Sequence, residues 1–115
     1  GAVQGIPVCF DAKECNTDTF PLQNIHAHQV QFMIDFEKQG GISFFLLSFT
    51  ARNEFYYLRL KELLIYWERA NSGGRKSFRY EELDPGFFLS LERGYMIPYL
   101  DALQKDLDLR GNETN

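Results

Sequence analysis

An acid and a lysine lie two residues apart near the start of the chain, at Asp11 and Lys13. On an extended strand these two side chains would point to the same face. Such a pair suits metal-dependent cleavage of a phosphodiester. The carboxylate can bind a hard cation such as Mg²⁺, while the amine orients the attacking water and offsets charge on the phosphate. The alternative is an ion pair at the surface of a strand.

The composition is typical of one compact domain over residues 1–115, with 44% hydrophobic and 16% aromatic residues. This aromatic content excludes a disordered chain and favours sheet-forming segments. Residues 1–7 lack the basic start and long apolar stretch of a signal peptide, and no apolar run is long enough to cross a membrane. We therefore expect a soluble, cytoplasmic protein that does not contact membranes.

The cysteines give no sign of a disulfide or a zinc site. Cys9 and Cys15 fall in or beside one expected strand, so joining them would require the chain to fold back sharply. We expect free thiols in a reducing compartment. The spacing of these cysteines from His26 and His28 matches no tetrahedral zinc pattern.

The net charge of −4 argues against a chain that acts alone as a strong electrostatic clamp on DNA. Basic residues nevertheless gather in a short Gly-rich segment, at Arg69, Arg75, Lys76 and Arg79. Two interpretations stay open for this segment. It is either a solvated loop or a local patch that binds phosphate.

Hydrophobic patterning predicts the order β, β, α, β, β, α, an α/β sandwich around a mixed sheet flanked by helices. We expect a hairpin that turns at Gly5, a strand over 8–14, a helix over 25–39, strands over 42–50 and 55–60, and helices over 60–70 and 101–107. The segments 78–83 and 87–91 are ambiguous, a loop is expected over 16–24 with Asn24 as a helix cap, and 108–115 is expected to be a flexible tail.

Within the expected helix over 25–39, Gln29 lies between apolar residues of the face that turns toward the sheet. His26 and His28 should lie on different helix faces. We interpret them as hydrogen-bonding residues at the helix start rather than general bases, because Lys13 already occupies the water-activating position. Trp67 and the Phe-rich run 44–49 are expected to belong to the core and to an interface.

Several blocks of the sequence resemble the RecU family of Holliday-junction resolvases. They are Phe10-Asp11-Ala12-Lys13-Glu14, Thr19-Phe20-Pro21-Leu22, Asn24-Ile25-His26-Ala27-His28-Gln29, Gly40-Gly41-Ile42, Trp67, Gly73-Gly74-Arg75-Lys76-Ser77 and Ile97-Pro98-Tyr99-Leu100-Asp101. The resemblance implies a restriction-endonuclease-like fold of the PD-(D/E)xK kind. It also implies a homodimer that nicks four-way DNA symmetrically with Mg²⁺, or with Mn²⁺ in its place, and that works with recombinase or branch-migration proteins.

Carried over position by position, the resemblance assigns roles to five residues. Asp11 takes the place of a metal-binding acid that is usually Glu in the family, and Lys13 matches the lysine that stabilises the transition state. Gln29 matches a helix glutamine that completes the surroundings of the metal. Arg75 and Lys76 match a basic motif that we interpret as a contact to the DNA backbone.

The family also carries a second metal-binding Asp and a basic stalk, which would precede Gly1. One carboxylate holds Mg²⁺ poorly, because several oxygen ligands must replace its lost hydration. We therefore expect the 115-residue chain alone to have little or no cleavage activity.

Two other functions stay open at this point. One is a DNA- or recombinase-binding dimer module that keeps the fold without cutting DNA. The other is a different PD-(D/E)xK enzyme, such as a restriction or repair nuclease that cuts duplex DNA. In a dimer, two sites could nick opposing strands of a two-fold symmetric junction. The strand over 55–60 could be an edge that joins subunits or an internal strand.

Overall fold

The computed structural model describes residues 2–3, 5–89 and 99–114. Its strands are β1 (Ala2–Val3), β2 (Ile6–Cys15), β3 (Thr19–Pro21), β4 (Ile42–Phe49), β5 (Glu54–Arg59), β6 (Ser77–Arg79) and β7 (Phe88–Leu89). Its helices are α1 (Ala27–Lys38), α2 (Leu60–Asn71) and α3 (Tyr99–Thr114), with short 3₁₀ helices η1 (Leu22–Asn24), η2 (Tyr80–Glu82) and η3 (Pro85–Phe87).

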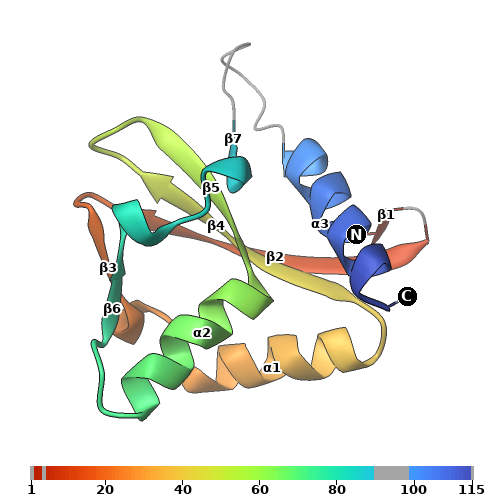
Figure 1. Cartoon of the computed structure of the whole chain (residues 1–115), viewed down its shortest axis with the longest axis horizontal. Coiled ribbons are helices and arrows are strands. Elements are labelled where there is room, and N and C mark those ends of the chain that lie inside the picture. The colour runs from red at the N-terminus through yellow and green to blue at the C-terminus, as the bar shows by residue number, and fades with distance from the viewer. Residues whose placement is uncertain (1, 4, 90–98, 115) are drawn as a thin grey trace.

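The main sheet is mixed and has the order β1-β2-β4-β5-β7 (Figure 1). β2 runs parallel to β4, and the other neighbouring strands are antiparallel. Asp11 and Tyr56 lie on one face of this sheet, where they bond to α1 and α2, and Tyr57 bonds to α3 on the opposite face. The expected α/β class, with a mixed sheet flanked by helices, is confirmed.

The parallel pair β2 and β4 is joined through α1, so these elements form a strand–helix–strand unit. Val30 and Met33 of α1 are buried. The helix ends before Gly40, whose φ of 93° is a conformation that favours glycine. The register pairs Asp11 with Phe45 and Lys13 with Leu47, so both charged residues lie beside the central strand.

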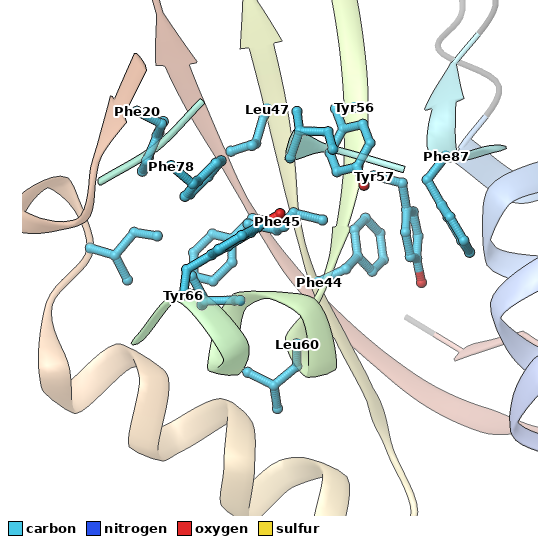
Figure 2. Close-up of a cluster of buried hydrophobic side chains, with 14 of the residues drawn as sticks. Phe20, Phe44, Phe45, Leu47, Tyr56, Tyr57, Leu60, Tyr66, Phe78 and Phe87 are labelled. Carbon is cyan, nitrogen blue, oxygen red and sulfur yellow. The ribbon is translucent and has the colours of Figure 1, made fainter. Parts of the chain in front are cut away.

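The core is built on β4, in which every residue except Ser48 is buried. Figure 2 shows aromatic rings from several elements meeting around this strand. Phe44 stacks on Tyr57 with ring centroids 4.1 Å apart, and Tyr66 of α2 stacks on Phe78 at 4.6 Å. Burial of each such side chain stabilises the fold by about 1.5–3 kcal/mol relative to exposure. The central strand predicted over 42–50 is therefore confirmed.

The loop predicted over 16–24 is wrong in part, because Thr19–Pro21 forms β3 and Leu22–Asn24 forms η1. β3 pairs with β6 from a distant part of the chain, and the fully buried rings of Phe20 and Phe78 stack across the pair at 5.1 Å. A three-residue strand with a distant partner leaves no periodic pattern. Asn24 is not the helix cap: that position belongs to His26, whose side chain makes no capping hydrogen bond.

The last helix is longer than expected, because α3 covers Tyr99–Thr114 rather than 101–107. Residues 108–114, expected as a tail, continue this helix. Arg110 there bonds to Asp106 in the same helix and to Glu37 of α1. These ion pairs attach the end of α3 to α1. The segment is polar in composition, which is why the sequence suggested a flexible tail.

The remaining expectations agree with the structure in outline. The hairpin at Gly5, the helix over 60–70 and the strand over 55–60 are present, and the last is internal, between β4 and β7. The ambiguous segment 78–83 continues β6 into η2, and 87–91 contains β7, with residues 90–91 outside the described part. No helix in the described part of the chain is long and apolar enough to span a membrane.

Candidate active site

Asp11 and Lys13 lie at alternate positions of β2 and face the layer that contains α1. The Lys13 Nζ atom lies 3.0 Å from Asp11 Oδ2, and the side chains are 22% and 41% exposed, respectively. Asp11 and Lys13 therefore lie on the same face of β2, as the two-residue repeat of a strand predicts. The pair is partly accessible to solvent.

Gln29 joins this pair from the first turn of α1. Its Nε2 atom donates a hydrogen bond of 2.8 Å to Asp11 Oδ2, the same oxygen that Lys13 contacts. Gln29 is half-buried, and Val30 beside it is buried. The packing of α1 therefore fixes the position of the Gln29 side-chain amide relative to Asp11. The structure thus brings together the three residues that the sequence singled out, which we call the Asp11 cluster.

The surroundings of Asp11 favour its charged form. Partial burial raises the pKa of this carboxyl, but hydrogen bonds from Gln29 and Lys13 and the charge of Lys13 together lower it by more. The net pKa lies below the ordinary value of an aspartate. Asp11 is therefore ionised at neutral pH and available as an anionic ligand.

The donors of the Asp11 cluster fit a hard cation. The Asp11 carboxylate and the Gln29 carbonyl oxygen are both oxygen ligands of the kind that Mg²⁺ and Mn²⁺ prefer. The Gln29 amide nitrogen faces Asp11 here, and rotation of the amide by half a turn would exchange its nitrogen and oxygen. Within residues 2–3, 5–89 and 99–114, no group of three or more His, Cys, Asp or Glu side chains could hold a metal. Water and phosphate oxygens would have to complete the coordination.

His26 and His28 lie together rather than on different helix faces, so that expectation is wrong. Their rings stack with centroids 5.4 Å apart, and both side chains are exposed. The reason is the backbone at His26, which is extended (φ −82°, ψ 143°), so helical spacing does not apply to this pair. The interpretation of His26 as a hydrogen-bonding residue at the helix start is also wrong, since its side chain caps nothing.

Arg75 and Lys76 lie in the turn after α2 and make no contact with the Asp11 cluster within the described residues. Arg75 pairs with Glu82 at 3.5 Å, and Glu82 also binds Arg69 at 2.6 Å. In the described part of the chain, no acidic side chain lies within ion-pairing distance of the exposed Lys76. Of the two basic residues, Lys76 therefore has the more available charge.

The sequence reasoning missed a buried polar cluster on the same sheet face as Asp11, between β5 and α2. Glu62 of α2 accepts hydrogen bonds from the hydroxyls of Tyr56, at 2.6 Å, and Tyr66, at 2.9 Å. Burial raises the pKa of Glu62, and the hydrogen bonds offset part of this effect. A signal was present, because Glu62 interrupts the apolar stripe formed by Leu60 and Leu63.

Comparison with known proteins gives a consistent result. The family model described as Recombination protein U matches residues 1–105. The chain is 38% identical over 110 residues to the Holliday junction resolvase RecU of Pediococcus pentosaceus, a match that covers 94% of this chain and 55% of that protein. It is 40% identical over 105 residues to the protein of the same name from Bacillus cereus, covering 90% of this chain and 52% of the relative. The chain thus spans about half the length of the curated relatives it matches.

Proposed function

The chain belongs to the recombination protein U family, and from that premise we propose that it is the nuclease core of a metal-dependent enzyme that resolves Holliday junctions. The fold we propose for this core is of the PD-(D/E)xK kind, and its substrate is four-way DNA. One observation carries the proposal: Lys13 and Gln29 converge on a single oxygen of Asp11, at 3.0 Å and 2.8 Å. An acid, a lysine and an amide at this spacing suit hydrolysis of a phosphodiester.

Each residue of the Asp11 cluster has a role in this proposal. Asp11 and the Gln29 carbonyl oxygen would hold Mg²⁺, or Mn²⁺ in its place. The bound cation would supply Lewis acidity to the phosphate and make a bound water more acidic. Lys13 offsets the charge that builds on the phosphate oxygens and orients the attacking water. Gln29 also fixes the rotamer of Asp11, so that little reorganisation is needed when DNA binds.

The reaction follows as an in-line displacement. A water oxygen forms a bond to phosphorus as the bond from phosphorus to the leaving sugar oxygen breaks. The attacking water releases a proton to solvent, and the leaving oxygen takes up a proton from solvent. No covalent enzyme intermediate is needed. Because a four-way junction is two-fold symmetric, we further propose a homodimer whose two sites nick opposing strands.

The test measures metal binding first and cutting second. Titration of the ¹⁵N-labelled protein with Mn²⁺ should broaden the Gln29 side-chain amide signal before others, because a paramagnetic ion acts on nearby nuclei. Asp11→Asn should remove this selectivity. Asp35→Asn, at an exposed acid of α1 that pairs with Gln31, is the matched control.

Cutting is then assayed on end-labelled four-way DNA. We expect slow nicking that rises with Mn²⁺ concentration and falls to background in Asp11→Asn, while Asp35→Asn cuts like the parent. A nicking rate that is the same in Asp11→Asn as in the parent would refute the proposal. So would uniform broadening by Mn²⁺ with no preference for Gln29.

A second candidate is a module that binds four-way DNA without cutting it. The observation in its favour is that the Asp11 cluster contributes one carboxylate among the described residues. Junction binding that is unchanged by EDTA, together with no nicking at any Mn²⁺ concentration, would favour this module over the nuclease.

A further inference from the structure

A groove lies between the segment that leads into α1 and the second half of α2. Its volume is about 370 Å³, within the range of about 300–1,000 Å³ for small-molecule sites. Ile25 and Leu22 line it and are 3% and 5% exposed, and the half-buried Trp67 lines it from α2. We call it the Trp67 groove. Its apolar lining contains the one tryptophan of the sequence.

The rim of the Trp67 groove is polar and exposed. Gln23 and Asn71 contribute side-chain amides, and Lys76 contributes an ammonium group. An amide can both donate and accept hydrogen bonds, as the edge of a nucleobase does. The indole ring is a surface on which any base can stack, and an ammonium pairs with a phosphate. These three kinds of group together match the parts of a nucleotide.

Backbone contacts fix the walls of the groove to one another. Leu22 N–H donates to the Lys76 carbonyl oxygen at 3.0 Å, next to the pairing of Pro21 with Ser77 between β3 and β6. The turn that carries Lys76 also packs tightly on α2. A Cβ at Gly74 would lie 2.7 Å from the Arg69 carbonyl oxygen, so only glycine fits there. The groove therefore keeps its shape without a ligand.

The Trp67 groove and the Asp11 cluster share a short stretch of the sequence. Ile25 lines the groove, and Gln29, four residues later, bonds to Asp11. Figure 1 shows β3 and β6 beside the end of α2 and the start of α1. A strand bound with one phosphate at Asp11 would thus have neighbouring nucleotides near the groove. Lys76, with no acidic partner among the described residues, offers the charge that complements such a strand.

From this geometry we propose that the Trp67 groove binds one unstacked base of the DNA strand held at the Asp11 cluster. The proposal rests on the function proposed above and adds a site for a base to it. The base stacks on Trp67, its edge meets Gln23 or Asn71, and Lys76 holds an adjacent phosphate. Stacking on an aromatic side chain tolerates any sequence, so the groove would recognise an unpaired base without reading its identity.

The single tryptophan makes the proposal directly testable, because its emission reports only on this groove. The probe is single-stranded oligothymidylate in EDTA, which separates binding from cutting. We expect the emission to be quenched as the oligonucleotide binds. An abasic strand with the same number of phosphates should quench far less, because it offers charge without a ring.

Variants separate stacking from charge. Trp67→Leu should weaken binding about 5- to 150-fold, as for loss of one stacked base, and Trp67→Phe should restore most of it by keeping a ring. Lys76→Gln, at an exposed position that should not disturb folding, should also weaken binding. Lys38→Gln removes a charge from the exposed last turn of α1 and should change binding little. Circular dichroism checks that each variant is folded.

Three results would overturn the proposal. One is equal quenching by the abasic strand. Another is equal quenching by polyglutamate, which would make the groove a general anion or peptide site. The third is that four-way DNA binds, as measured by fluorescence anisotropy of a label on the DNA, but leaves the tryptophan emission of the parent unchanged and binds Trp67→Leu with the same affinity. This third result would leave the nuclease proposal standing, whereas failure of four-way DNA to bind or to be cut would remove both.

Discussion

Arg110 of α3 and Glu37 of α1, 73 residues apart in sequence, form an ion pair through two hydrogen bonds of 3.0 Å each. Glu37 Oε2 also accepts the backbone N–H of Ser43 at 2.7 Å, at the start of β4. Arg110 also donates a hydrogen bond to Asp106, and Asp106 accepts a second hydrogen bond from the buried hydroxyl of Tyr57. The pair therefore joins both helix layers at one end of the sheet.

Arg110→Met tests this connection. The variant keeps the apolar stem but leaves Glu37 and the buried Asp106 without their cation, so we expect unfolding to become easier by about 2–3 kcal/mol. Urea unfolding at pH 7 measures the loss. Arg79→Met, which breaks an exposed pair with Glu81 at 4.0 Å, should cost less than about 1 kcal/mol. Equal losses in the two variants would contradict the assigned importance of the Arg110 pair.

Gln29→Leu tests the part of α1 that reaches Asp11. The leucine packs at the same place but neither donates to Asp11 nor offers an oxygen to a cation. We expect affinity for Mn²⁺ to fall about 10- to 100-fold, as for loss of a group that orients a metal ligand. Calorimetry gives the affinity. Gln31→Leu, at the exposed glutamine that bonds to Asp35 on the same helix, should bind Mn²⁺ like the parent protein.

The titration of Asp11 should occur at unusually low pH. Its pKa is lower in the folded than in the unfolded chain, so the stability it contributes is present above the unfolded pKa and is lost as pH falls through the folded pKa. We expect metal binding to persist from pH 7 to about 5 and to fail only below the ordinary aspartate pKa of about 3.9. Carbon NMR of the side-chain carboxyl follows this titration. Its midpoint should rise in Gln29→Leu, and a parent midpoint at or above the ordinary value would disprove the expectation.

Glu62 should give the opposite pH dependence. Burial raises its pKa in the folded state, so its protonated form contributes stability below the unfolded pKa, and this contribution is lost as pH rises through the folded pKa. Glu62→Gln does not titrate. The unfolding free energy of the variant should therefore improve relative to the parent between about pH 4 and 7. Glu81→Gln, at an exposed position, should show no such divergence, and parallel curves for Glu62→Gln and the parent would exclude the effect.

The two basic residues of the turn after α2 should contribute unequally to DNA binding. Lys76→Gln should weaken binding of all sequences alike and reduce the slope of log affinity against log salt by about 1. Arg75→Gln should reduce it by less, because Glu82 already neutralises part of the Arg75 charge. Anisotropy titrations between about 50 and 200 mM salt give the slopes. A larger effect from Arg75 would reverse this ranking.

The sequence was most informative where the fold depends on local patterns. The period of two placed Asp11 and Lys13 on one face, and the helical period placed Gln29 toward them, so the Asp11 cluster could be anticipated. The continuous apolar run 42–50 likewise indicated the central strand. These signals are contained in short stretches of chain.

Two of the features that were missed depend on partners that are distant in sequence. β3 exists because it pairs with β6, and the end of α3 is tied to α1 through Arg110 and Glu37. His26 and His28 stack because the chain is still extended at His26, a boundary that helical periodicity cannot locate. The acid Glu62 could be buried because two tyrosine hydroxyls meet it from different elements.

The two ends of α1 are secured over very different spans of chain. Gln29 meets Asp11 across 18 residues, within one strand–helix connection, whereas Glu37 meets Arg110 across 73. Closing a longer loop costs more chain entropy, so the contact between Glu37 and Arg110 depends more on the rest of the fold than the contact between Gln29 and Asp11 does. Loosening or removing α3 would then free the far end of α1, while the end that carries Gln29 stays attached to β2 through Asp11.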